Sequence, residues 1–181
     1  IVPALLAGNC VVFKPADLVP ATAWTLAEII SRSGIPEGVF NLVMGRGSVV
    51  GEALAASADV NGISFTGSVE TGGHLAEKAA QTMKKVQLEM GGKNPLVILD
   101  DADLDIAVDV AVQGAFYSTG QRCTASSRFI VTKGIHDAFI NRIIDTMDKL
   151  MIGHALKEGT QIGPVVDESQ LHQNLKYLTI G

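Results

Sequence analysis

The segment 40-FNLVMGRGSVVGEALAASADVNGISFTGS-68 decides the fold. Its first five residues form a strand-like run that ends at a glycine, and residues 49–57 then favour a short helix. Residues 62–66 form a second strand-like run, and the Gly67-Ser68 pair after it opens another helix. Strand, helix and strand in this order, and at these lengths, are typical of βαβ crossovers between parallel strands.

The same alternation continues on both sides of this segment. A β-branched run at 11–14 precedes apolar residues at helical spacing over 22–33. Downstream, the helix that opens at Gly67-Ser68 reaches about residue 83, and a further strand covers 86–89. The predicted fold class is therefore α/β, with a Rossmann-like, doubly wound parallel sheet. Such sheets bind ligands beyond the carboxyl ends of their strands.

Gly91-Gly92 is the predicted boundary between two domains, 1–90 and 91–181. The second stretch begins another α/β domain, which we expect to be incomplete. Its pattern predicts a helix opened by acidic N-cap and first-turn residues and a loop that contains Cys123. The predicted elements are a strand at 95–99, a helix at 104–116, a loop at 118–126, a strand at 128–131 and a helix at 136–150.

Bulk composition narrows the class of protein. Hydrophobic residues make up 47% of the 181 residues, which suffices for a core and argues against disorder. The net charge of −5, with no basic cluster larger than Lys84-Lys85, argues against a nucleic-acid surface. The apolar runs are short and interrupted, so no membrane span is expected.

The cysteines and the two ends of the chain suggest a compartment and a context. Cys10 enters an apolar strand whereas Cys123 lies in a polar loop, so we predict no disulfide and a reducing, cytoplasmic location. The first residues do not have the pattern of a signal peptide, so none is expected. It starts inside an apolar segment at Ile1 and stops directly after a helical run, which we interpret as a piece of a longer protein.

Two glycine turns are candidate phosphate-binding sites. Gly45-x-Gly-x-x-x-Gly51 lies between a strand and a helix, but its spacing is looser than G-x-G-x-x-G, which leaves a plain turn as the alternative. At Phe65-Thr66-Gly67-Ser68 the glycine lets backbone approach a ligand, and the helix that follows offers N–H groups to a pyrophosphate. A serine that only caps the helix is the alternative there.

Charged residues at strand ends are further candidates. Lys14 ends the first strand and Asp17 follows it, where both suit ribose hydroxyls or a phosphate; an exposed lysine and a turn aspartate are the alternatives. Glu89 ends an apolar strand. A carboxylate in apolar surroundings has a raised pKa and can act as a base near neutrality. A glutamate bonded to a neighbouring loop is the alternative.

A catalytic hypothesis depends on Cys123. Its neighbours are small, polar and flexible, which suits an accessible thiol, and Arg122 helps to favour the thiolate. A cysteine with a structural role only is the alternative. Neither a nucleophile pattern nor metal-ligand spacing is found at the four histidines, so no metal site is expected: His74, His136, His154 and His172.

Four segments in register carry a resemblance that covers the whole chain. NCVVFKPA at 9–16, FTGS at 65–68, LEMGGKNP at 88–95 and GQRCTASSR at 120–128 resemble consecutive motifs of the aldehyde dehydrogenase superfamily. Glu89 and Cys123 are 34 residues apart (123 − 89), as they are in that family. The resemblance implies Cys123 as nucleophile and Glu89 as general base. It implies cofactor contacts at Lys14 and Asp17 (adenosine ribose), Gly47 and Gly51 (adenine side), Gly67, Ser68 and Gly72 (pyrophosphate), and Met90 (nicotinamide).

The reaction implied by the resemblance is oxidation of an aldehyde to a carboxylic acid through a cysteine thiohemiacetal and thioester. The cofactor is NAD or NADP, because Asp17 stands where many members have Glu and leaves more room for a 2′-phosphate. MGRGSVVG at 44–51, with the residues at 116–119, looks most like the branch that oxidises α-ketoglutaric semialdehyde. Arg122 then pairs with a substrate carboxylate, or it faces solvent or the other domain. Succinate semialdehyde is the alternative substrate.

The resemblance also implies parts that this chain lacks. The family's oxyanion-hole asparagine lies upstream of these residues, and a glutamate for the nicotinamide ribose and the oligomerising strands lie outside them too. We therefore expect the isolated chain to be poorly folded and inactive, and the longer protein to be a homodimer or homotetramer. A non-catalytic nucleotide-binding fragment or paralogue remains the alternative from another class. A dehydrogenase that passes its acyl group to coenzyme A is disfavoured by Glu89.

Overall fold

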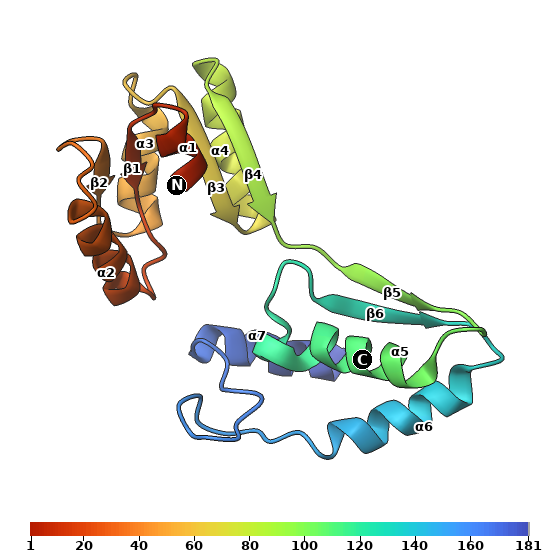
Figure 1. Cartoon of the computed structure of the whole chain (residues 1–181). Coiled ribbons are helices and arrows are strands. Elements are labelled where there is room, and N and C mark those ends of the chain that lie inside the picture. Colours follow the sequence, from red (N-terminus) through yellow and green to blue (C-terminus); the bar gives the residue numbers. More distant parts are fainter. Residues whose placement is uncertain (181) are drawn as a thin grey trace. The chain divides into compact units, whose positions relative to one another are not determined.

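The computed structural model describes residues 1–180, and they form two compact units that divide between Glu89 and Met90 (Figure 1). Both units are α/β, as the alternation of the sequence predicts. Each is described by itself below.

The first unit contains two pairs of strands with a helix in each crossover (Figure 1). β1 pairs with β2 in parallel, with Val11 opposite Phe40 and Phe13 opposite Leu42. β3 pairs with β4, and the two arrows point the same way in Figure 1. The predicted βαβ order is therefore confirmed. The elements are α1 (Val2–Leu6), β1 (Val11–Phe13), α2 (Pro20–Ser31), β2 (Phe40–Leu42), η1 (Gly47–Gly51), α3 (Glu52–Ala56), β3 (Gly62–Gly67), α4 (Val69–Gln81) and β4 (Lys85–Met90).

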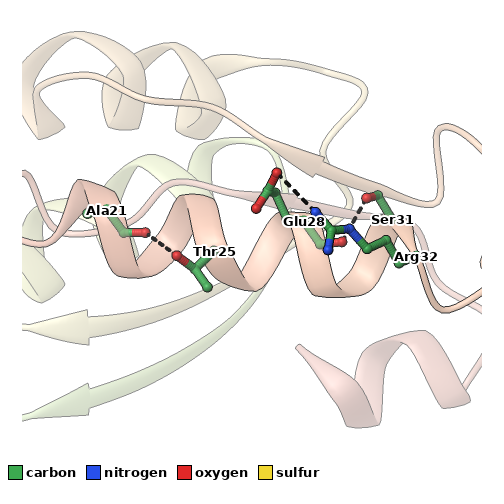
Figure 2. A network of polar contacts seen from close by, with 5 residues as sticks. All are labelled: Ala21, Thr25, Glu28, Ser31 and Arg32. Carbon is green, nitrogen blue, oxygen red and sulfur yellow. Dashed lines mark hydrogen bonds and ion pairs between the residues drawn. The ribbon is translucent and has the colours of Figure 1, made fainter.

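Helix α2 begins at Pro20, two residues before the predicted start. Proline suits the first helical position because its missing N–H is one that the first turn leaves without a partner. Polar side chains line an exposed part of the helix and bond along its axis, as Figure 2 shows. Thr25 Oγ1 donates to the Ala21 carbonyl at 3.0 Å, and Ser31 Oγ donates to the Glu28 carbonyl at 2.8 Å. The hydroxyl groups on this face are therefore hydrogen-bonded within α2 itself.

The single short helix predicted over 49–57 is wrong in detail, because the structure has a π-helical turn, η1, followed by α3. The turn opens after Gly45, whose φ of +144° is a conformation that glycine adopts readily and L side chains rarely adopt. A Cβ on Gly45 would also lie 2.6 Å from Cγ2 of Val50. Gly45 therefore lets the chain turn closely onto η1.

The second unit contains one parallel pair of strands packed against helices. β5 (Asn94–Ile98) pairs with β6 (Ser126–Val131), and the register shifts between Asn94 and Pro95. Helix α5 (Leu104–Phe116) has the predicted bounds, and Asp103 caps it by accepting from the Ile106 amide at 3.0 Å. The remaining elements are η2 (Tyr117–Gly120), α6 (His136–Met147) and α7 (Glu168–Ile180).

The core of the second unit lies between one face of this sheet and helices α5 and α6. Phe139 is fully buried and meets Phe129 edge to face, with ring centroids 5.8 Å apart. The opposite sheet face is open: Val97 and Ile130, which are partners in the register, are 56% and 50% exposed. The buried residues of this core are Ile98, Val108, Ala111, Val112, Ile135, Phe139 and Ile143.

Within residues 1–180 the strands form three separate two-stranded sheets rather than one continuous sheet. In the same range, no helix has both the length and the apolar character needed to cross a bilayer.

Candidate functional site

The carboxyl ends of β1 and β2 flank a small hollow of about 190 Å³ in the first unit. Lys14 follows β1 directly, and its Nζ lies 2.7 Å from Oδ1 of Asp17 and donates to the Pro15 carbonyl at 2.6 Å. The lysine side chain is only 17% exposed, whereas that of Asp17 is 48% exposed. The hollow is lined by Pro15, Ala16, Asp17, Pro20, Met44, Gly45 and Arg46.

This arrangement brings together two residues that the sequence singled out. The ammonium of Lys14 neutralises the Asp17 carboxylate while the aspartate keeps an exposed edge toward solvent. A carboxylate held in this way can accept hydrogen bonds from vicinal hydroxyls, as acidic residues do in nucleotide folds. Gly47 and Gly51 begin and end the η1 turn, which follows Arg46 at the rim of the same hollow.

The FTGS turn joins β3 to helix α4. Ser68 is the N-cap, and its Oγ accepts from the Thr71 amide at 3.2 Å. Ser68 therefore caps the helix, as the alternative predicted. Other amides of the first turn stay available for an anion at the positive end of this 13-residue helix. Gly67 closes β3 beneath Phe65, since a Cβ there would meet the ring at 2.4 Å, and Gly72 is buried in α4.

Glu89 does not have the apolar surroundings that we predicted for it. It is exposed near the end of β4, and Nε2 of Gln87 lies 3.4 Å from its Oε1. Burial alternates along this strand, so that Lys85, Gln87 and Glu89 share the exposed face while Val86, Leu88 and Met90 are half-buried. The carboxylate is therefore accessible rather than enclosed by hydrocarbon within its unit.

Cys123 lies in the loop between η2 and β6 of the second unit, and its side chain is exposed. Three consecutive residues ahead of it have left-handed backbone, with φ of 54° at Ser118, 53° at Thr119 and 68° at Gly120. Such conformations are costly for non-glycine residues and persist only where the surroundings impose them. The loop is therefore held in a defined shape.

Two side chains attach this loop to its surroundings. Asn94 Nδ2 donates to the Cys123 carbonyl at 2.7 Å and to the Ala125 carbonyl at 3.1 Å. Arg122 Nη2 donates to the backbone carbonyl of Gln113 in α5. Arg122 is exposed, in line with the solvent-facing alternative, and its bond to α5 was not predicted. Its guanidinium has five N–H donors, and this bond uses one.

Asn94 is a residue that sequence reasoning missed. The only available signal was its place in the LEMGGKNP segment, because bonds from a side chain to loop carbonyls leave no periodic pattern. Cys123 is exposed, as predicted, and Cys10 is exposed as well. Glu89 belongs to the first unit and Cys123 to the second. Among residues 1–180, no three His, Cys, Asp or Glu side chains gather into a group that could hold a metal ion.

Comparison with known proteins places these features in context. The sequence pattern that defines the aldehyde dehydrogenase family matches residues 1–181. Alpha-ketoglutaric semialdehyde dehydrogenase of Bacillus subtilis (strain 168) is 46% identical over 182 residues, which cover 99% of this chain and 37% of that protein.

Two solved structures are similarly close. An NADP-dependent enzyme of Escherichia coli has a TM-score of 0.95 at 42% identity, covering 98% of this chain and 37% of that one. Betaine aldehyde dehydrogenase of Staphylococcus aureus, in complex with NAD+, has a TM-score of 0.94 at 38% identity, covering 98% and 35%. The chain therefore spans little more than a third of the length of each.

Proposed function

Because the chain belongs to the aldehyde dehydrogenase family, we propose that it carries the nucleophile, the general base and part of the cofactor site of an enzyme that oxidises an aldehyde to a carboxylic acid with NAD or NADP. The observation that carries the proposal is the exposed thiol of Cys123 on a loop that is anchored on both sides of it. Residues 1–90 are assigned to the cofactor domain and 91–181 to the catalytic domain.

The chemistry begins at Cys123. Its thiolate adds to the aldehyde carbon and gives a tetrahedral thiohemiacetal, whose oxyanion is stabilised by backbone N–H groups near the cysteine. When bound, the nicotinamide supplies the hydride acceptor. Loss of that hydride from the substrate carbon leaves a thioester on Cys123.

Glu89 completes the turnover. Its exposed carboxylate takes a proton from a water molecule, whose oxygen attacks the thioester carbon. The C–S bond then breaks, the cysteine thiolate is restored and the carboxylic acid leaves. Prompt hydrolysis at this step distinguishes the proposed enzyme from one that passes its acyl group to coenzyme A.

The cofactor is assigned to the first unit. Lys14 and Asp17, which form one ion pair beside the hollow, hold the adenosine ribose, and Gly47 and Gly51 line the adenine side. The turn at Gly67 and Ser68, with Gly72 in the helix behind it, is assigned to the pyrophosphate, because the free amides at a helix start favour an anion. Met90 lies near the nicotinamide. Either NAD or NADP serves as the cofactor in this proposal, since the similar structures include an NADP-dependent enzyme and one solved with NAD+.

We assign α-ketoglutaric semialdehyde as the substrate, with succinate semialdehyde as the alternative. Support comes from the 46% identity to the Bacillus subtilis enzyme and from the unused N–H donors of Arg122, which suit a substrate carboxylate. Betaine aldehyde carries a positive charge where the semialdehydes carry a carboxylate, so it serves as the contrasting substrate. Each substrate is assayed with NAD and with NADP. If Arg122 binds the carboxylate, Arg122→Leu raises KM for the semialdehydes but not for betaine aldehyde, whereas loss of its bond to Gln113 changes kcat for both substrates alike.

The full-length protein, a cytoplasmic homo-oligomer in this proposal, allows a direct test by iodoacetamide. Labelling of Cys123 abolishes turnover, and bound cofactor changes the labelling rate. Cys123→Ser is inactive, whereas Cys10→Ser, the matched control in the first unit, keeps its activity. Unchanged turnover after complete labelling of Cys123 would eliminate the mechanism and favour a non-catalytic nucleotide-binding chain.

A further inference from the structure

Asn94 stands where β5 begins, next to the loop that carries the nucleophile. It is opposite Ser126, the first residue of β6, and the regular register starts only at Pro95 and Arg128. The side chain is half-buried and reaches two carbonyls of the loop that precedes β6. Neither bond belongs to the strand ladder, so the amide holds the loop itself.

The two bonds come from the same amide nitrogen, which has two hydrogens to donate. Nδ2 lies 2.7 Å from the carbonyl oxygen of Cys123 and 3.1 Å from that of Ala125. Fixing the Cys123 carbonyl fixes the peptide plane that follows the nucleophile, and thereby limits the directions its Cβ–Sγ bond can take. The Ala125 side chain is 5% exposed, so the second carbonyl sits on a packed part of the loop.

The other side of Cys123 is held independently. Arg122 bonds to the Gln113 carbonyl of α5, and the Ala125 amide donates to the Arg122 carbonyl at 2.9 Å. Asn94 supplies the restraint that comes from the sheet. A nucleophile that must meet both a hydride acceptor and a water works only in a narrow range of positions, where an error of about 1 Å can cost roughly 100-fold in rate.

We propose that Asn94 is a positioning residue for Cys123: its side-chain amide clamps the carbonyls on either side of Thr124 and so sets the direction and reactivity of the thiol. This rests on the proposed role of Cys123 as nucleophile. Asparagine is suited to the task because an amide offers two N–H donors, whereas a serine offers one O–H and an ionised aspartate offers only acceptors. An aspartate has the same shape, but its negatively charged carboxylate would face two carbonyl oxygens and be repelled by them.

The experiment uses Asn94→Asp and Asn94→Ser in the full-length protein. Asn41→Asp is the matched control, because Asn41 Nδ2 also donates to a backbone carbonyl, that of Gly38 at 2.8 Å, in the first unit. The measurements are the alkylation rate of Cys123 by iodoacetamide from pH 6 to 10, kcat and KM for aldehyde and cofactor, and the melting temperature.

We expect Asn94→Asp to change the Cys123 alkylation rate and to lower kcat, each by about tenfold or more, with KM for the cofactor within about twofold. Asn94→Ser gives an intermediate effect. Asn41→Asp leaves the alkylation rate, kcat and KM for the cofactor unchanged. If Asn94→Asp fails to fold, Asn94→Ser decides by the same measurements. Alkylation and kcat within twofold of wild type in the folded variants would overturn the proposal. An active Cys123→Ser protein would instead refute the function on which it rests.

Discussion

The carboxylate of Asp100 occupies the space into which a side chain on Gly134 would project. The Gly134 amide donates to Asp100 Oδ1 at 2.8 Å, the Ile135 amide donates to the same oxygen at 3.2 Å, and the Thr132 hydroxyl donates to it as well. A Cβ on Gly134 would lie 2.7 Å from Cγ of Asp100. One aspartate thus joins the end of β5 to the turn between β6 and α6.

Gly134→Ala is expected to destabilise the second unit. The new methyl displaces the Asp100 carboxylate from its hydrogen bonds, so the variant should melt below wild type. Gly73→Ala, in helix α4 with open space around the new Cβ, is the matched control and should stabilise by about 0.5–1 kcal/mol. Thermal melts of the full-length variants measure both. Equal melting temperatures for the two variants would contradict the steric argument.

The same carboxylate gives a pH-dependent contribution to stability. The Thr132 hydroxyl, followed by the Gly134 and Ile135 amides, holds the pKa of Asp100 below its ordinary value of 3.8. A depressed folded-state pKa stabilises the fold above the unfolded pKa, and this contribution disappears as pH falls through the lower folded value. Asp100→Asn should therefore melt lower than wild type at pH 7, and the gap should narrow below about pH 3.8. A gap that stays constant from pH 7 to 3 would argue against this origin.

Glu89→Gln should separate the two halves of the proposed reaction. Thioester formation does not need the base, so the first turnover still releases one reduced cofactor per active site. Hydrolysis then slows by roughly 100-fold or more, within the usual range for a lost general base. Stopped-flow absorbance of the reduced cofactor shows this as a burst. Glu77→Gln, an exposed glutamate of α4, is the control. A slow phase without a burst would assign Glu89 another role.

Asp17→Glu tests the cofactor assignment. The longer carboxylate extends into the hollow beside Lys14, so it should repel a 2′-phosphate and shift kcat/KM toward NAD by about tenfold, equivalent to about 1.4 kcal/mol. Asp59→Glu, at an exposed aspartate of the same unit, controls for added length elsewhere. An unchanged ratio of NAD to NADP efficiency would place the ribose away from Asp17.

Local sequence signals predicted the α/β class and the order of its elements well. The acidic N-cap at Asp103 gave α5 its start, and β-branched runs gave the strands their places. The surroundings of Glu89 were misjudged although KVQLEM alternates polar and apolar residues, a period-two pattern that puts the glutamate on the open face.

Other features had no local signal to read. The ion pair of Lys14 with Asp17 and the bond of Arg122 to Gln113 depend on side-chain directions that spacing alone does not fix. The Asn94 clamp joins residues 29 and 31 positions apart. The left-handed Ser118 and Thr119 are residue types that ordinarily avoid that conformation, so tertiary contacts rather than local preference hold them there.

The cysteine loop is therefore not a portable motif. Its shape is imposed by an amide at the start of β5 and a carbonyl inside α5, both outside the loop. A synthetic peptide copying GQRCTASSR, or a graft of these nine residues onto a foreign scaffold, would contain the thiol. It would lack the contacts from outside the loop that fix the loop's conformation. Engineers who transplant the nucleophile need to transfer the β5 start and the α5 end with it.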